Sequence, residues 1–119
     1  MRLLYIIIGI LAVISLAGCG KQWKAEELVE QFIEQNAQNP EKINRLSYGR
    51  LDSTRHISDS LLLSMQAKDH AQFKPGIGYE AKTSGRILYL LRMKYEYEGD
   101  TLSNTFYMDE HIQQIVGFK

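Results

Sequence analysis

The chain has 119 residues, with 14 Lys or Arg residues balanced by 14 Asp or Glu residues, one Cys and 45% hydrophobic residues. This length accommodates a single domain. Because basic and acidic residues are interspersed, composition excludes the polybasic surface with which proteins neutralise nucleic-acid phosphates. A single Cys excludes an internal disulfide framework and a multi-cysteine metal site.

The N-terminal residues predict an export signal. A positive charge at Arg2 precedes Leu3–Leu16, an uncharged apolar run. The run is shorter than the roughly 20 apolar residues that a membrane-spanning helix needs. Leu16-Ala17-Gly18-Cys19 follows directly, and this tetrapeptide resembles the lipobox of bacterial lipoproteins. An uncleaved membrane anchor and a secretory signal with an incidental Cys are the two alternatives.

The resemblance to bacterial lipoproteins implies a lipidation site and a location. Such proteins lose the signal before the Cys, whose thiol carries diacylglycerol, so Cys19 would be the first mature residue and its acyl chains would attach the protein to the membrane. Residues 1–18 would then be signal peptide, residues 19–23 a short tether and residues 24–119 a single domain. Gly20 replaces the Asp that retains enterobacterial lipoproteins in the inner membrane. This favours the outer membrane, with the domain in the periplasm or at the cell surface.

The first half of the domain predicts two helices and a strand. Apolar residues recur at helical spacing over Gln22–Gln38, which indicates an amphipathic helix ended by Asn39-Pro40. After it we expect the following elements: a single helical turn at Pro40–Ile43, a strand over Leu46–Leu51, a helix over Ser58–Ala71 and a loop over Phe73–Gly78.

The C-terminal third predicts an antiparallel meander. Leu91, Met93, Tyr95 and Tyr97 alternate with charged residues, which indicates a strand that begins near Arg86. Turns at Glu98–Asp100 and Asp109–His111 then flank a strand over Leu102–Met108, and Ile112–Phe118 forms the last strand. We therefore expect an α+β fold in which the N-terminal amphipathic helix packs on a curled antiparallel sheet. This element order resembles a cystatin-like roll and carries no functional weight.

Catalytic and metal-binding patterns receive little support from the sequence. We interpret His56, His70 and His111 as surface residues rather than metal ligands, because none has a second ligand at helical i, i+4 spacing. No Ser lies in a Gly-x-Ser-x-Gly elbow, and Cys19 is used by the lipid. Gly76-Ile77-Gly78 predicts a turn rather than a dinucleotide fingerprint. We expect no enzymatic activity, no metal and no cofactor.

One face of the long strand is rich in tyrosine. Tyr89, Tyr95 and Tyr97 alternate along it, and Tyr107 lies on the next strand beside Phe106. We interpret this face as the core beneath the helix; the alternative is a ligand or partner face formed by Tyr89, Tyr95, Tyr97 and Tyr107. Trp23 lies at the start of the helix, where contact with the membrane interface and packing on the sheet are both open.

These observations favour a lipid-anchored envelope lipoprotein that acts as a non-catalytic binding or accessory module. We expect an envelope protein as partner, and no nucleic acid. One alternative is a small-molecule carrier or enzyme with a pocket between the helix and the tyrosine-rich sheet. Another is a protein inhibitor or immunity-type lipoprotein.

Overall fold

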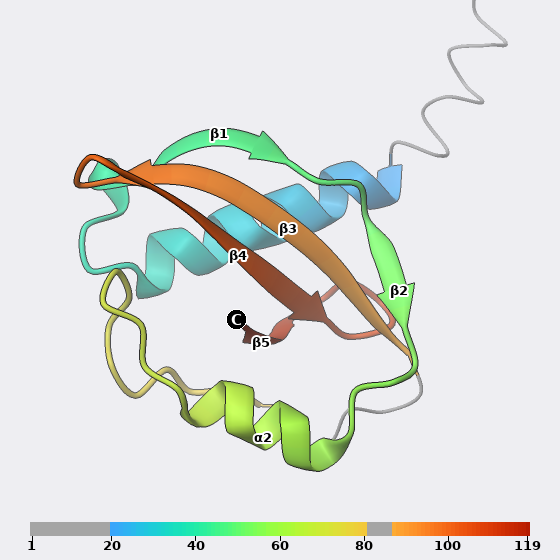
Figure 1. The fold of residues 1–119 in the computed structure, drawn as a ribbon. Coiled ribbons are helices and arrows are strands. Elements are labelled where there is room, and N and C mark those ends of the chain that lie inside the picture. Colours follow the sequence, from blue (N-terminus) through green and yellow to red (C-terminus); the bar gives the residue numbers. More distant parts are fainter. Residues whose placement is uncertain (1–19, 81–86) are drawn as a thin grey trace, which may run out of the picture.

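The computed structural model of the protein describes residues 20–80 and 87–119, so the predicted signal, the lipobox and the expected strand start near Arg86 lie outside the described residues. The N-terminal helix occupies residues 20–36, including the segment after Cys19 that the sequence predicts as a tether. The remaining elements, shown in Figure 1, are η1 (Pro40–Lys42), β1 (Asn44–Tyr48), β2 (Asp52–Thr54), α2 (Asp59–Ala67), β3 (Leu88–Tyr97), β4 (Asp100–Met108) and β5 (Ile115–Phe118). Within the described residues, no helix has the length and apolarity to span a bilayer.

The five strands form one open antiparallel sheet in the order β1-β3-β4-β5, and β2 pairs with β3 as well. The expected α+β class and C-terminal meander are confirmed. The β3–β4 hairpin closes where Tyr97 pairs with Asp100, with Glu98 and Gly99 as the two loop residues. Both have positive φ, 50° and 85°, as a type I′ turn requires.

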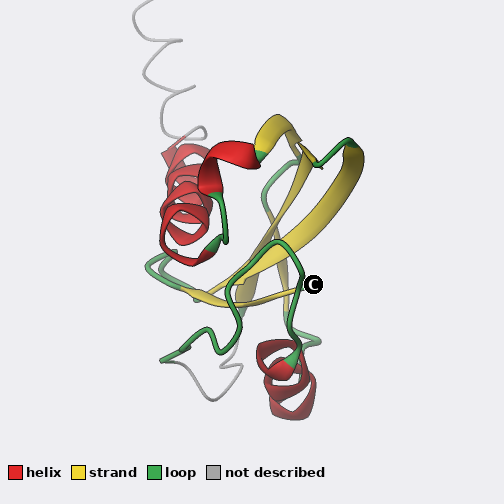
Figure 2. Cartoon of the chain, turned by 90° about the vertical axis from the view of Figure 1, so that its left-hand side faces the viewer, coloured by secondary structure: helices red, strands yellow, loops and turns green. Residues whose placement is uncertain are grey.

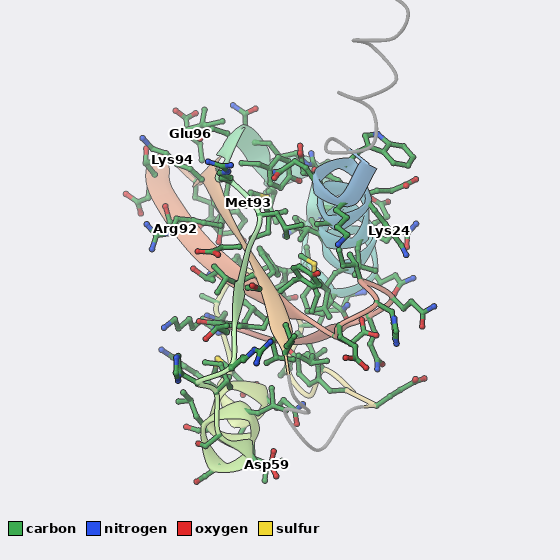
Figure 3. The ribbon with its side chains drawn as sticks, turned by 90° about the vertical axis from the view of Figure 1, so that its right-hand side faces the viewer. Lys24, Asp59, Arg92, Met93, Lys94 and Glu96 are labelled. Carbon is green, nitrogen blue, oxygen red and sulfur yellow. The ribbon has the colours of Figure 1, made fainter. Side chains whose placement is uncertain are left out.

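Helices cover both faces of the sheet. The N-terminal helix buries its apolar stripe on one face, against a cluster that includes Leu91, Met93, Tyr95 and Phe106, all fully buried. On the other face α2 packs Leu62 and Met65 against a smaller cluster from β3, β4 and β5. Figure 2 shows the two helices apart, with strands between them. Figure 3 shows Met93 directed toward the N-terminal helix, while Arg92, Lys94 and Glu96 project from the opposite side.

The predicted first strand is wrong in its extent, because the segment divides into β1 and β2. Residues 49–51 interrupt the ladder, and the N-terminal helix holds this break through one side chain. Gln22 Nε2 donates to the Gly49 carbonyl at 3.0 Å, and Gln22 Oε1 accepts from the Leu51 amide at 2.7 Å. The Gly49 amide still donates to the Arg92 carbonyl of β3 at 2.7 Å, so Gln22 replaces strand pairing at the Gly49 carbonyl and the Leu51 amide only.

Several other boundaries also differ from prediction: the N-terminal helix ends at residue 36 rather than 38, and β4 begins at Asp100 rather than Leu102. Helix α2 ends at Ala67 rather than Ala71, since Leu62 and Met65 are its only buried residues and nothing apolar extends its contact with the sheet. The chain then turns to the end of the N-terminal helix, where the Lys74 amide donates to the Asn36 carbonyl at 2.8 Å. The last strand begins at Ile115 rather than Ile112.

Candidate functional site

The four tyrosines singled out in the sequence do not share one face. Tyr95 is fully buried beneath the N-terminal helix, and Tyr89 and Tyr97 are partly buried at the margin of the same cluster. Tyr107 lies on the opposite face of the sheet, within the cluster under α2. The reason is the strand period of two, which directs Phe106 toward the N-terminal helix and its neighbour Tyr107 away from it.

Tyr95 belongs to a buried hydrogen-bond network. Its hydroxyl donates to Asn104 Oδ1 and accepts from Gln72 Nε2, and Asn104 Nδ2 donates to the Lys119 carbonyl at 3.2 Å. Burial raises the pKa of the Tyr95 phenol, which keeps it protonated. Because the surrounding side chains are fully buried, this network supports the core rather than opening a pocket between helix and sheet.

The histidines differ from one another in their environment. His56 and His111 are exposed, as the sequence predicts. His70 is only partly exposed. Its ring stacks on Phe118 with 4.3 Å between centroids, and its buried Nε2 has no hydrogen-bond partner among the described residues. Burial, followed by the charge of Lys68, lowers the pKa of His70 below 6.5. Within residues 20–80 and 87–119, potential metal ligands do not gather in groups of three or more.

One flank of the N-terminal helix is fixed to β1. Glu30 accepts a hydrogen bond from the Tyr48 hydroxyl and forms an ion pair with Arg45. Burial and the Glu30 carboxylate raise the pKa of Tyr48 well above its usual range. Trp23 lies beside this cluster and is 66% exposed. This flank therefore combines a fixed contact with one large exposed aromatic ring.

The other flank of the helix borders a groove, and this is the candidate site. We use the term helix groove for two adjoining hollows that share Leu28, Gln31 and Gln113. The deeper hollow measures about 380 Å³, within the range of about 300–1,000 Å³ that is typical of small-molecule sites. The second hollow, of about 350 Å³, continues along the helix to Lys24.

The deeper hollow is lined by neutral amides over an apolar base. Its five carboxamide side chains come from the helix and from the β4–β5 connection: Gln31, Gln35, Asn36, Gln113 and Gln114. The base contains Leu28, Phe32, Tyr79 and Ile115. The ring of Tyr79 stacks on Phe32 with 6.3 Å between centroids and 24° between planes. Burial raises the pKa of Tyr79 to about 12, so this phenol is a neutral donor.

A compact turn positions two of these carboxamides. Asp109 Oδ1 accepts from the backbone amides of Gln113 and Gln114 at 2.7 and 3.0 Å. The Asp109 carbonyl accepts from the Ile112 amide at 3.1 Å, and the Asp109 amide donates to the Gln114 carbonyl at 3.3 Å. Ile112 has a φ of 51°, a conformation that costs a β-branched residue roughly 1–3 kcal/mol. We call residues 109–114 the Asp109 turn.

Comparisons with protein-family models, with curated proteins and with solved structures find no match, so the assignment of a site rests on this chain alone. The resemblance to a cystatin-like roll accordingly stays an expectation from element order. None of the carboxamides of the groove is a predicted site residue. One available signal is that Gln31 and Gln35 are uncharged on a helix surface otherwise rich in Glu, but their position opposite Gln113 and Gln114 is a tertiary contact.

Proposed function

We propose that this protein is a lipid-anchored lipoprotein of the bacterial envelope, attached through Cys19, whose domain is a non-catalytic binding module. The observation that carries the anchoring is Leu16-Ala17-Gly18-Cys19 at the end of an apolar run. The observation that carries the binding role is the helix groove with its carboxamide lining.

The N-terminal helix relates the groove to the proposed anchor. An α-helix rises about 1.5 Å per residue, so the groove residues from Lys24 to Asn36 extend over about 18 Å of helix. By the same rise, Lys24 lies about 6 Å from Gly20, the first described residue. A ligand in this groove would therefore be held close to the membrane surface. The exposed Trp23 suits such a position, since an amphipathic ring is favoured at a membrane interface.

The carboxamide groups that line the helix groove are suited to binding a ligand. Carboxamides donate and accept hydrogen bonds and carry no charge at neutral pH. The strained backbone at Ile112 supports the same view, because strain of this kind is concentrated at ligand sites and has to be held by the surrounding structure. Here the Asp109 carboxylate supplies that support.

The anchor is tested by metabolic labelling with radioactive palmitate. The wild-type chain should incorporate the label and remain with membranes, and Cys19→Ser should do neither. Equal labelling of the two proteins would disprove lipidation at Cys19. A Ser15→Ala variant, which changes a polar residue ahead of the tetrapeptide, is the matched control and should be labelled like the wild type.

The binding role is tested by complementation of a deletion strain. We expect detergent resistance of the envelope to be restored by the wild type and by Glu34→Ala, which alters an exposed residue of the same helix outside the groove. Gln31→Ala/Gln35→Ala should not restore it, although Ala is a better helix former than Gln and the fold should persist. Full complementation by this double variant would show that the groove is not the functional site.

A further inference from the structure

The hydrogen-bonding groups of the helix groove are largely free to bind a ligand. Within the described residues, the side chains of Gln31, Gln35, Gln113 and Gln114 make no hydrogen bond to another protein group. Asn36 differs, because its Nδ2 donates to the Phe32 carbonyl at 3.0 Å within the helix. Each free carboxamide offers two donors and one acceptor oxygen. The groove therefore matches a ligand whose own groups both donate and accept.

Charge in the groove is low and nearly balanced. Among the described residues that line the deeper hollow, Glu80 is the one ionisable acid or base apart from the neutral phenol of Tyr79. The second hollow adds Lys24 and Glu27, whose formal charges cancel. In the part of the lining that the structure describes, an anionic ligand such as a phosphate ester would find no cluster of basic groups, and a cation would find no cluster of carboxylates. The lining therefore favours a neutral ligand.

The apolar base of the groove adds a second requirement. The half-buried Tyr79 ring lies over Phe32, which is 8% exposed and serves as its support. Leu28 and Ile115 extend this base on either side. An occupant must therefore present C–H groups on one face and polar groups around its edge. Sugar rings have this arrangement, with axial C–H groups beneath and hydroxyls at the periphery.

A peptide fits the groove less well. Extended peptides are commonly bound by adding a strand to an exposed sheet edge, where main-chain hydrogen bonds supply affinity. The edge strand that reaches the groove is β5, whose four residues are all buried. The Val116 carbonyl of this strand already accepts from Gln66 Nε2 at 2.8 Å. The polar groups of the groove are side-chain amides, which suit hydroxyl and acetamido groups.

We propose that the helix groove binds a neutral oligosaccharide, whose hydroxyl or acetamido groups bond to Gln31, Gln35, Gln113 and Gln114 while a sugar face lies against Tyr79. This inference rests on the proposed function, in which the groove is the binding site. It adds the chemical class of the ligand. The two adjoining hollows and their extent of about 18 Å along the helix favour a chain of sugars over a single ring.

The test uses the full-length lipidated protein in detergent micelles and a biotinylated tetrasaccharide of N-acetylglucosamine on a biosensor surface. We expect saturable binding that Gln31→Ala/Gln35→Ala weakens at least tenfold, because each lost hydrogen bond contributes a several-fold change. Glu34→Ala should bind like the wild type. A second double variant, Gln113→Ala/Gln114→Ala, should weaken binding similarly from the opposite wall of the groove, and circular dichroism checks that each variant is folded.

Three results would overturn the proposal: no binding of either the tetrasaccharide or cellotetraose, binding that both double variants leave unchanged, or preference for a neutral octapeptide over both sugars. These results are distinguishable from failure of the proposed function. If the groove variants still fail to complement the deletion strain, then the groove binds a ligand of another class. If they complement fully, then the groove is not the functional site at all.

Discussion

Replacement of Asp109 by Ala should release the wall of the helix groove that carries Gln113 and Gln114. The carboxylate accepts two backbone amides at 2.7 and 3.0 Å. Hydrogen bonds to charged groups contribute about 1.5–3 kcal/mol each when buried. Asp109 is only partly buried, so water compensates in part and about 1 kcal/mol for each bond is the appropriate estimate. The total of about 2 kcal/mol corresponds to a roughly 30-fold change in the opening equilibrium.

Hydrogen exchange followed by mass spectrometry measures this opening directly. The amides of residues 109–114 should exchange roughly 30-fold faster in Asp109→Ala, and less so in Asp109→Asn, which retains a neutral acceptor. Glu110→Ala is the matched control, because it removes the same charge from the same turn but breaks only an exposed contact of 3.5 Å to His111. Equal exchange in Asp109→Ala and Glu110→Ala would refute the claim that the carboxylate holds this turn. The Asp109→Ala protein should also lose affinity for the tetrasaccharide.

Three further predictions concern the stability of the full chain in detergent, measured by urea unfolding. Glu98→Asn should stabilise by about 0.5 kcal/mol, since Asn tolerates the positive φ of a type I′ turn better than Glu; an unchanged midpoint would contradict this. Tyr95→Phe should destabilise by about 2 kcal/mol, because Asn104 loses a buried donor; a neutral effect would mean that the network does not support the core. With the pKa of His70 below 6.5, the unfolded state binds the proton first, so stability should be full above pH 6.5 and fall as pH drops toward the folded-state pKa; His70→Phe should remove this part of the slope.

The sequence predicts the elements whose position depends on one dominant interaction, the burial of an apolar face. The alternation of apolar and charged residues along β3 specifies a strand with one buried face, and the helical spacing of Ala25, Val29 and Ile33 specifies the element that covers it. The break between β1 and β2 was not accessible in this way. It depends on Gln22, a side chain 27 residues away from Gly49 in the chain, which satisfies backbone groups that would otherwise require strand pairing.

The buried hydrogen-bond network around Tyr95 could be predicted from the sequence only in part. Period two in β4 places Asn104 on the same inward face as Phe106, so a polar side chain at a core position is visible in the sequence. A buried amide requires partners, and Tyr95 on the neighbouring strand is an available one. Gln72 could not be identified, because it reaches the network only after α2 ends at Ala67 and the chain turns back.

The reason that the last strand begins later than predicted also explains how the helix groove forms. A tight turn at Asp109–His111 would place Ile112 in the ladder, where its neighbours would continue the sheet. Instead the Asp109 carboxylate takes the amides of Gln113 and Gln114, so the ladder begins only at Ile115. Gln113 and Gln114 form a wall opposite the N-terminal helix, with the Gln114 carbonyl still accepting from the Asp109 amide, and Ile112 has a positive φ in this turn. The helix groove therefore depends on local hydrogen bonds from one acidic side chain, which replace strand pairing at residues that the hydrophobic periodicity assigns to the strand.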